Sequence, residues 1–280
     1  MSTNLEVGIV GLPNVGKSTL FNAITKAGAE AANYPFCTIE PNVGVVDVPD
    51  ARLNVLGEMF KSKKIVPAAM RFVDIAGLVK GASKGEGLGN KFLAHIREVD
   101  AVAQVVRCFE DGNITHVEGS INPLRDIEII NTELCLADME TVEKRQERLV
   151  KLLKTGDKKV PVEKAVLDKV MEGLGEAVPA RRLGLTDEEK EFLTELHLLT
   201  MKPVLYVANV AEDEVAAPEN NPHVQAVRKY AEEEGAETIV VSAKMESEIA
   251  ELPEDEAKEF LEMAGLEEAG LDRLIKAGFK

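Results

Sequence analysis

The sequence predicts an α/β fold with a mostly parallel, doubly wound sheet, interrupted by an all-helical insertion. Towards both ends of the chain, short apolar runs alternate with helical patterns, which is typical of parallel sheets covered by helices. Aromatic residues make up only 4% of the chain and Trp is absent, so the core must be largely aliphatic, as such sheets require. The middle of the chain shows helical periodicity alone, which predicts the insertion.

In the first part of the chain, a strand, a glycine-rich turn and a helix follow one another directly. The strand is expected over Glu6 to Val10 and the helix over Ser18 to Ala27. Helical spacing returns from Ala51 to Phe60. Further strands are expected at Val43 to Val48, Met70 to Ile75 and Ala101 to Cys108.

The last part of the chain repeats the strand–helix–strand order. The strands are expected at Val204 to Ala208 and Thr238 to Val241, and a helix from Pro222 to Glu234 lies between them. Gly235 follows this helix, as is common just after a helix C-terminus.

The insertion is expected to be an antiparallel pair of long helices. Apolar positions recur at steps of three and four, first from Ile127 to Thr141 and then from Val162 to Leu174, with the polar turn Thr155 to Lys159 between them. Thr186 and Glu189 fit a capping box that would start a third helix running through Leu199. We therefore assign residues 1–130 and 202–280 to the α/β part and 131–201 to the helical, coiled-coil-like insertion.

The overall charge argues against some classes of partner. A formal net charge of -16 disfavours a nucleic-acid or membrane-surface binder, although this is an average that leaves room for a local basic patch. The run Lys61, Lys63 and Lys64 is one candidate for such a patch, and a solvated loop is the favoured interpretation.

Cysteine usage and hydropathy indicate the compartment. The three cysteines, Cys37, Cys108 and Cys135, are far apart and show no metal-binding spacing, which favours reduced thiols. The chain starts with no basic and apolar leader, and no stretch approaches the length of a membrane span. A soluble, cytoplasmic protein without a membrane partner is expected.

The turn after the first strand carries the most specific motif. Residues Gly11 to Ser18 match G-x-x-x-x-G-K-S, with a strand before and a helix after, as a phosphate-binding P-loop requires. Backbone N–H groups of such a loop face one centre, and the following helix adds its positive end. Lys17 would reach the β- and γ-phosphates, and Ser18 would offer a hydroxyl to Mg²⁺. The predicted nucleotide contacts in this loop are Asn14, Val15, Gly16, Lys17, Ser18 and Thr19.

Two further elements would complete the magnesium and γ-phosphate site. Asp74 ends a predicted strand in a D-x-x-G sequence and would hold Mg²⁺ through water, while the Gly77 amide would meet the γ-phosphate. Thr38, in the loop after the first helix, would add a hydroxyl to the metal. Together these positions predict a Ras-like nucleoside triphosphatase.

The base site is expected after the fifth and sixth strands. The strand ending at Ala208 is followed by Asn209-Val210-Ala211-Glu212, where most GTPases carry N-K-x-D. The longer carboxylate of Glu212 cannot hold the guanine edge at the distance an aspartate does, so guanine preference should be weak or lost. Val210 takes the place of the lysine that lies along the base. The loop Ser242-Ala243-Lys244 would flank the base.

These motifs together resemble the YchF / Obg-like ATPase family of Obg-related GTPases. The resemblance covers essentially the whole chain. Its most specific parts are Gly11 to Ser18, Tyr34 to Pro41, Asp74 to Ala82 and Gly85 to Asn90, while Asn209 to Glu212 separates the chain from Obg itself. The resemblance implies a Ras-like domain with a helical insertion, hydrolysis of ATP and often GTP, and association with ribosomes. That family continues into a β-rich C-terminal TGS domain, which would begin where this sequence stops.

The catalytic group that positions water remains open. Ras-like enzymes use a glutamine after D-x-x-G, whereas this chain has Leu78. His116 in the loop after Cys108 is one candidate, beside a surface-loop histidine. Asn14 resembles the P-loop asparagine of potassium-dependent GTPases, which suggests a K⁺ ion, or it simply caps the loop.

Three functional readings follow. The leading one is an ATP-hydrolysing, Mg²⁺-dependent switch. The others are a GTP-specific switch and a nucleotide-binding scaffold without turnover, which the intact Lys17, Ser18 and Asp74 disfavour. The oligomeric state is open, with a monomer as the working expectation.

Overall fold

A computed structural model of the chain describes residues 5–28, 43–47, 69–75, 88–110, 120–266, 269–270 and 273. Several sequence-predicted features lie outside these residues: the helix at 51–60, the lysine run at 61–64, Cys37, Thr38, Gly77, Leu78 and His116.

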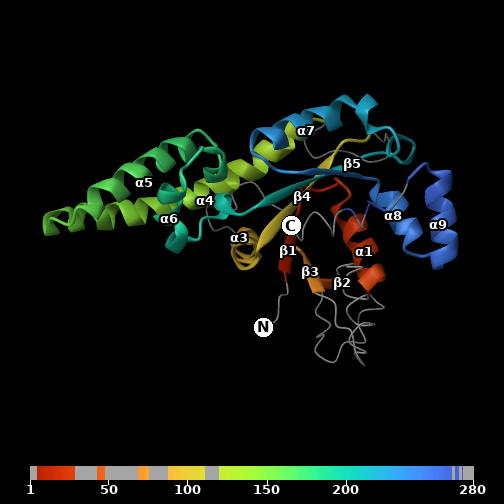
Figure 1. The fold of residues 1–280 in the computed structure, drawn as a ribbon, viewed down its shortest axis with the longest axis horizontal. Helices are drawn as coiled ribbons and strands as arrows, with labels where there is room; N and C mark the ends of the chain where they lie inside the picture. The colour runs from red at the N-terminus through yellow and green to blue at the C-terminus, as the bar shows by residue number, and fades with distance from the viewer. Residues whose placement is uncertain are drawn as a thin grey trace, which may run out of the picture.

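The described strands form one sheet in the order β2-β3-β1-β4-β5-β6 (Figure 1). All neighbours are parallel except β2 and β3. The predicted mostly parallel sheet is therefore confirmed, and every predicted strand lies within one residue of its observed bounds. These bounds are β1 (Leu5–Val10), β2 (Val43–Asp47), β3 (Ala69–Asp74), β4 (Ala101–Arg107), β5 (Val204–Asn209) and β6 (Thr238–Val241).

Helices cover both faces of the sheet, because successive side chains of a strand point to opposite sides. On β4, Val105 is buried in the same cluster as Leu20 of α1 (Lys17–Gly28). The next residue, Val106, is buried in a second cluster with Val224 of α7 (Pro222–Glu233). The doubly wound arrangement is thus present in the packing as well as in the topology. The remaining α-helices of the described residues are α3 (Leu88–Glu98), α4 (Pro123–Leu152), α5 (Lys159–Gly175), α6 (Asp187–Glu191), α8 (Ala243–Ile249) and α9 (Glu254–Met263).

The helices α4 and α5 form the predicted antiparallel pair, which extends away from the sheet as an arm (Figure 1). Asn122 caps α4 by accepting a hydrogen bond from the Arg125 backbone N–H at 3.1 Å. The first part of α4 packs in the core of the sheet, whereas Leu149 belongs to a separate cluster with α5. One continuous helix therefore joins the two parts, and the proposed boundary at residue 131 falls inside it.

The third helix of the insertion is shorter than expected. The capping box at Thr186 and Glu189 is present, but α6 ends at Glu191 instead of continuing through Leu199. His197 adopts a left-handed backbone conformation, with φ 48°. Leu199–Met201 forms a separate 3-10 turn, which three hydrogen bonds to the buried Asp138 carboxylate hold in place, from the Leu199 N–H and from the Thr200 N–H and hydroxyl. Tertiary contacts thus override a good local start signal.

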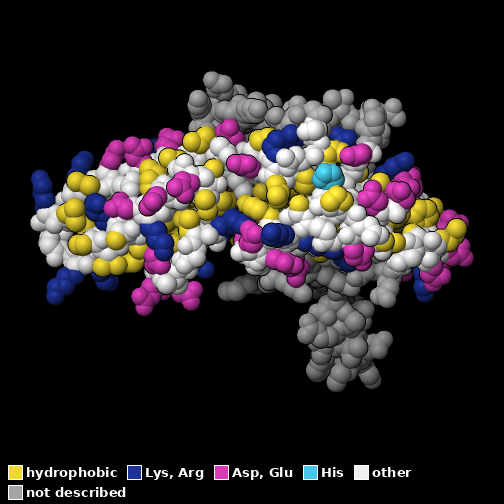
Figure 2. Space-filling model, turned by 90° about the horizontal axis from the view of Figure 1, so that it is seen from above, with side chains coloured by type: hydrophobic (Ala, Val, Ile, Leu, Met, Phe, Trp, Pro, Cys, Tyr) yellow, Lys and Arg dark blue, Asp and Glu magenta, His cyan; other side chains and the backbone are white. Residues whose placement is uncertain are grey.

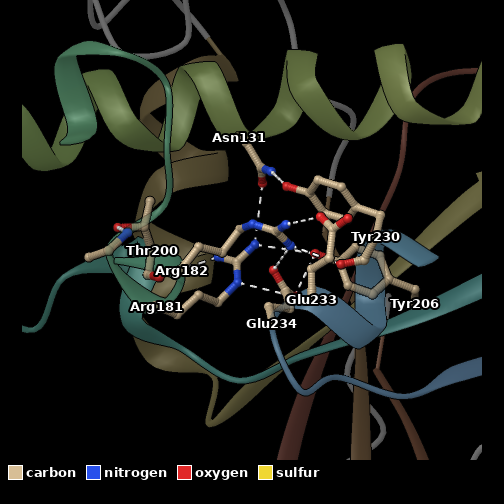
Figure 3. A network of polar contacts seen from close by, with 9 residues as sticks. Asn131, Arg181, Arg182, Thr200, Tyr206, Tyr230, Glu233 and Glu234 are labelled. Atoms are coloured by element: carbon tan, nitrogen blue, oxygen red, sulfur yellow. Dashed lines mark hydrogen bonds and ion pairs between the residues drawn. The ribbon is translucent and has the colours of Figure 1, made fainter. Parts of the chain in front are cut away.

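The arm meets the sheet through a buried network of charges (Figure 3). The Glu234 carboxylate, just after α7, accepts hydrogen bonds from Arg182 at 2.8 Å and from the Tyr206 hydroxyl at 2.7 Å, and it pairs with Arg181 at 3.4 Å. The Glu234 side chain is only 2% exposed. The Arg182 guanidinium also lies 3.8 Å above the ring of Tyr230. We call these five residues the joint network.

Two polar groups of the arm complete the joint network. The Asn131 amide of α4 donates to the Tyr230 hydroxyl at 3.0 Å. The Thr200 carbonyl accepts from Arg181 at 3.3 Å. The joint therefore connects α4, the segment after α5, the strand β5 and the helix α7.

Candidate nucleotide-binding site

A cleft of about 820 Å³ lies at the edge of the sheet where β1, β4, β5 and β6 end. Ligands bind in this position in open α/β sheets. Eleven of the predicted site residues line it, together with neighbours from the same loops: Asn14, Gly16, Lys17, Ser18, Thr19, Asn209, Val210, Glu212, Ser242, Ala243 and Lys244.

The loop before α1 needs glycine at position 16. Gly16 has a φ of 93°, and a Cβ atom there would lie 2.1 Å from the side-chain nitrogen of Asn209. Asn14 also has positive φ, 66°, a conformation that asparagine tolerates better than most residues. Val15, also predicted as a nucleotide contact, is buried in the core and is not among the residues that line the cleft.

Asn209 fastens the loop before α1 to the loop after β6. Its side-chain N–H donates to the Val15 carbonyl at 2.9 Å, and its carbonyl oxygen accepts from the Ala243 N–H at 2.9 Å. Asn209 is 4% exposed. The side chain was predicted to meet the base, and the structure adds a positioning role. An asparagine amide has a second hydrogen and a second lone pair, so the base contact stays a prediction.

Lys17 and Asp74, predicted to serve the phosphates and the metal, lie side by side. The Lys17 ammonium is 2.5 Å from the Asp74 carboxylate and donates to the Ile75 carbonyl at 2.7 Å. The two side chains are 12% and 19% exposed. The pair links the start of α1 to the end of β3. A phosphate group could take the place of Asp74 beside Lys17, and a divalent cation could take the place of Lys17 beside Asp74.

The donors for a metal are hydroxyl and carboxylate oxygens, which suit a hard cation such as Mg²⁺. Ser18, in the first turn of α1, is exposed to the cleft, and Asp74 lies beside its neighbour Lys17. Within the described ranges, no three His, Cys, Asp or Glu side chains gather into a metal-binding group. The donor set therefore fits an ion that a bound phosphate helps to hold.

The two loops expected to flank the base face each other. The Lys244 ammonium is 3.5 Å from the Glu212 carboxylate, and their side chains are 78% and 37% exposed. Ser242 caps α8, its hydroxyl accepting from the Met245 N–H at 3.3 Å. This cap fixes the start of the loop that carries Ala243 and Lys244.

Comparison with known proteins places these features in a family. A profile described as "50S ribosome-binding GTPase" matches residues 6–161. The "Ribosome-binding ATPase YchF" of Bacillus subtilis is 62% identical over 98% of this chain and 75% of its own length. The chain belongs to the YchF family. The YchF proteins of Pasteurella multocida and Haemophilus influenzae are each 57% identical over 98% of this chain and 75% of theirs.

A solved YchF structure shares the fold. It is titled "Structure of the Schizosaccharomyces pombe YchF GTPase" and superposes with a TM-score of 0.83 at 42% identity, covering 99% of this chain and 75% of that one. The P-loop triphosphatase fold and the resemblance drawn from the motifs are both confirmed.

Sequence reasoning missed part of the cleft wall. Phe109 and Glu110, which follow β4, line the cleft. They lie in the loop after Cys108, which the sequence had singled out only as a source of the catalytic group. The Arg107 guanidinium lies 4.6 Å from the centre of the Phe109 ring, which holds the aromatic side chain in place. This position could have been predicted from the sequence, because residues that directly follow a central parallel strand lie at the edge of the sheet where ligands bind. Leu12 and Pro13 of the predicted P-loop and Ala211 of the predicted base motif also line the cleft, together with Asp213, which was not predicted.

Proposed function

We propose that this chain is a Mg²⁺-dependent triphosphatase that hydrolyses ATP, and GTP as well, and that acts as a nucleotide-dependent switch on the ribosome. The single observation that carries the proposal is the meeting of Lys17 and Asp74 beside a cleft whose other wall comes from the loops after β5 and β6. The ribosome enters through the relatives, which are named ribosome-binding ATPases. Action on the ribosome would place the protein in the cytoplasm.

The proposed reaction depends mainly on positioning and charge. Lys17 would exchange Asp74 for the β- and γ-phosphates, and the positive end of α1 would add to its charge. Ser18 and Asp74 would hold the metal, which neutralises developing charge on the phosphates when bound. Thr38 and Gly77 are proposed to close the γ-phosphate side, as in Ras-like enzymes; both lie outside the described residues.

The base preference follows from the loop after β5. Val210 cannot lie along a base as a lysine stem does, and the Glu212 carboxylate pairs with Lys244 at 3.5 Å. A site that lacks a well-placed acceptor for the guanine N1–H and amino group has little means of favouring guanine. Phe109 offers an aromatic face to either purine. We therefore favour ATP, with a GTP-specific switch as the alternative.

The experiment is phosphate release from ATP and GTP by the wild-type chain and by Lys17→Ala. The proposal predicts turnover of both nucleotides in the wild type and a loss of about 10²–10³-fold in the variant, since one positioned charge is removed from the transition state. Circular dichroism should show an unchanged fold. Binding without turnover in the wild type would support the scaffold alternative instead.

Two finer assignments stay proposals with their own tests. If His116 positions the attacking water, His116→Ala should lose turnover and keep nucleotide affinity, whereas Leu78→Ala should keep both. If Asn14 helps to hold K⁺, hydrolysis should be faster in K⁺ than in Na⁺; equal rates would remove that ion from the account.

A further inference from the structure

We propose that Asn221 is a positioning residue for the purine base: it sets the spacing of the two cleft loops that follow β4 and β5. The inference rests on the proposed function, because it takes the ligand of the cleft to be a purine nucleotide. Asn221 is 5% exposed and lies directly before α7. It is not among the residues that line the cleft, so it would act on the base only through other residues.

The Asn221 side chain ties three segments together. Its N–H groups donate to the Cys108 carbonyl, just after β4, at 2.8 Å and to the Glu214 carboxylate, after β5, at 2.6 Å. Its carbonyl oxygen accepts from the N–H groups of His223 and Val224, at 2.9 and 3.3 Å, and so caps α7. An asparagine amide has two hydrogens and two carbonyl lone pairs, so all four of its hydrogen-bonding positions are in use.

The loop after β4 brings an aromatic side chain to the cleft. Phe109 lines the cleft and directly follows Cys108. The Arg107 Nε donates to the Phe109 carbonyl at 3.1 Å, and the Arg107 guanidinium lies over the Phe109 ring. Arg107 and Asn221 are both buried. The carbonyls of two consecutive residues are thus held by buried side chains, which fixes where the ring stands.

The loop after β5 reaches Asn221 through the short 3-10 turn Glu212–Glu214. The first two residues of this turn line the cleft, and the third, Glu214, accepts the hydrogen bond from Asn221. The next residue, Val215, is 4% exposed and belongs to the core cluster beneath α7. The bond between Asn221 and Glu214 therefore holds the turn at a set distance from the loop that carries Phe109.

Asn209 and Asn221 hold different parts of the cleft. Asn209 joins the phosphate-binding loop to the loop after β6, whereas Asn221 joins the loops after β4 and β5. Loss of the Asn221 bonds should therefore weaken the contacts with the base and leave the phosphate site at Lys17 intact. Affinity falls in proportion to the fraction of molecules in which the binding loops are correctly placed.

The test is a calorimetric titration of Asn221→Asp with ATP and with tripolyphosphate, which offers three phosphates but no base, each in Mg²⁺. Aspartate keeps the two acceptor contacts that cap α7, but it cannot donate to the Cys108 carbonyl, and it places a second carboxylate beside Glu214. The matched control is Asn122→Asp. Asn122 caps α4 by accepting from the Arg125 N–H, and it is exposed.

The control separates the position of the new carboxylate from its charge, because both variants gain one negative charge. Figure 2 shows Asp and Glu side chains spread along the molecule, from the arm to its opposite end, and the formal net charge is already -16. One more carboxylate therefore changes the overall field little, and Asn122→Asp should keep its affinity for ATP within about twofold.

Asn221→Asp should bind ATP about tenfold more weakly, as expected if the two loops are correctly placed in about one tenth of the molecules. Its affinity for tripolyphosphate and its kcat at saturating ATP should stay within about twofold of the wild type, while KM for ATP rises. Equal losses for ATP and tripolyphosphate would show that the whole cleft is disturbed and would overturn the proposal. Unchanged affinity for ATP would overturn it as well.

A second pair of variants tests the bond between the loops directly. Glu214→Gln alone should keep the affinity for ATP within about threefold, because the glutamine carbonyl still accepts from Asn221. In the double variant Asn221→Asp/Glu214→Gln, the glutamine amide donates to the aspartate, so the affinity should recover by at least about threefold over that of Asn221→Asp. No recovery would overturn the proposal.

Circular dichroism checks the fold of each variant. If Asn221→Asp does not fold, Asn221→Ser takes its place, since serine also caps a helix but is too short to donate to both loops. The same loss of affinity for ATP, with that for tripolyphosphate retained, is expected for Asn221→Ser.

Turnover separates this inference from the proposed function. A wild type that binds ATP without hydrolysing it would contradict the proposed function alone, because the test of Asn221 depends on binding. A wild type that hydrolyses ATP, together with wild-type affinity in Asn221→Asp, would contradict the inference alone.

Discussion

The cleft and the joint network both depend on ion pairs, but they use them differently. In the cleft, Lys17 and Asp74 contact each other through side chains that are 12% and 19% exposed. In the joint network, the Glu234 side chain is 2% exposed and pairs with both Arg181 and Arg182. Lys17 lines a cavity in which a ligand can replace its partner, whereas the carboxylate that the joint pairs share is buried.

This difference assigns different tasks to the two regions. A partly exposed ion pair adds little stability, and its groups remain available for chemistry. A buried charge that loses its partner is strongly destabilising, so the joint fixes how the arm is attached to the sheet. The joint also borders the site through β5, which carries Tyr206 in the joint and Asn209 in the cleft.

The largest expected effect is on the joint. Glu234→Ala should lower the free energy of unfolding by about 3–5 kcal/mol, because two guanidinium groups, on side chains only 11% and 14% exposed, lose the buried carboxylate that they share. Urea unfolding is the measurement. The neighbouring Glu233 also pairs with Arg182 but is 54% exposed, so Glu233→Ala is the control and should cost less than about 1 kcal/mol. Similar losses in the two variants would contradict the comparison.

An intermediate effect is expected for Asn209→Ala. The substitution leaves the Val15 carbonyl and the Ala243 N–H without their buried partner, which should cost about 1–3 kcal/mol of stability. Because these bonds hold two cleft loops together, nucleotide affinity should fall as well. Calorimetry would measure the affinity for ATP, and urea unfolding would measure the stability. If the nucleotide affinity falls while the stability is unchanged, Asn209 contacts the base and does not hold the two loops together.

A small effect on stability is expected for Lys17→Ala. Its ion pair with Asp74 is partly exposed, so the free energy of unfolding should change by less than about 1 kcal/mol while hydrolysis is lost. The same urea titration measures it. A cost as large as that of Glu234→Ala would show that the cleft pair is structural, and the contrast between the two regions would fail.

The smallest effect concerns the thiols of Cys108 and Cys135. Both are free, and burial raises the pKa of each to about 12. Only the thiolate reacts with alkylating reagents, so both should stay unmodified at pH 8 in the folded chain and react when urea is added. Mass spectrometry resolves each site. Rapid alkylation of Cys108 in the folded chain would mean that the packing beneath β4 opens readily.

The cleft could be predicted from the sequence because its residues follow strands that apolar runs identify. The P-loop is contiguous, and Asp74 and Asn209 each stand at the end of such a run. The joint could not be predicted: Arg181 meets Asn131 across 50 residues and Glu234 across 53, and no local pattern encodes those distances. Val162 is a second position that the sequence pattern did not predict correctly. Its place in a series with steps of four predicted a core position, but its side chain is 53% exposed near the end of the arm.

We expect the cleft to bind and turn over ATP without the guanine contact of related GTPases. The decisive measurement is calorimetry with Mg²⁺, which compares the affinities for ATP, ADP, GTP and GDP side by side. ATP should bind as tightly as GTP or more tightly. A guanine affinity a hundredfold above the adenine affinity, about 2.7 kcal/mol, would contradict it and show that Glu212 performs the guanine contact.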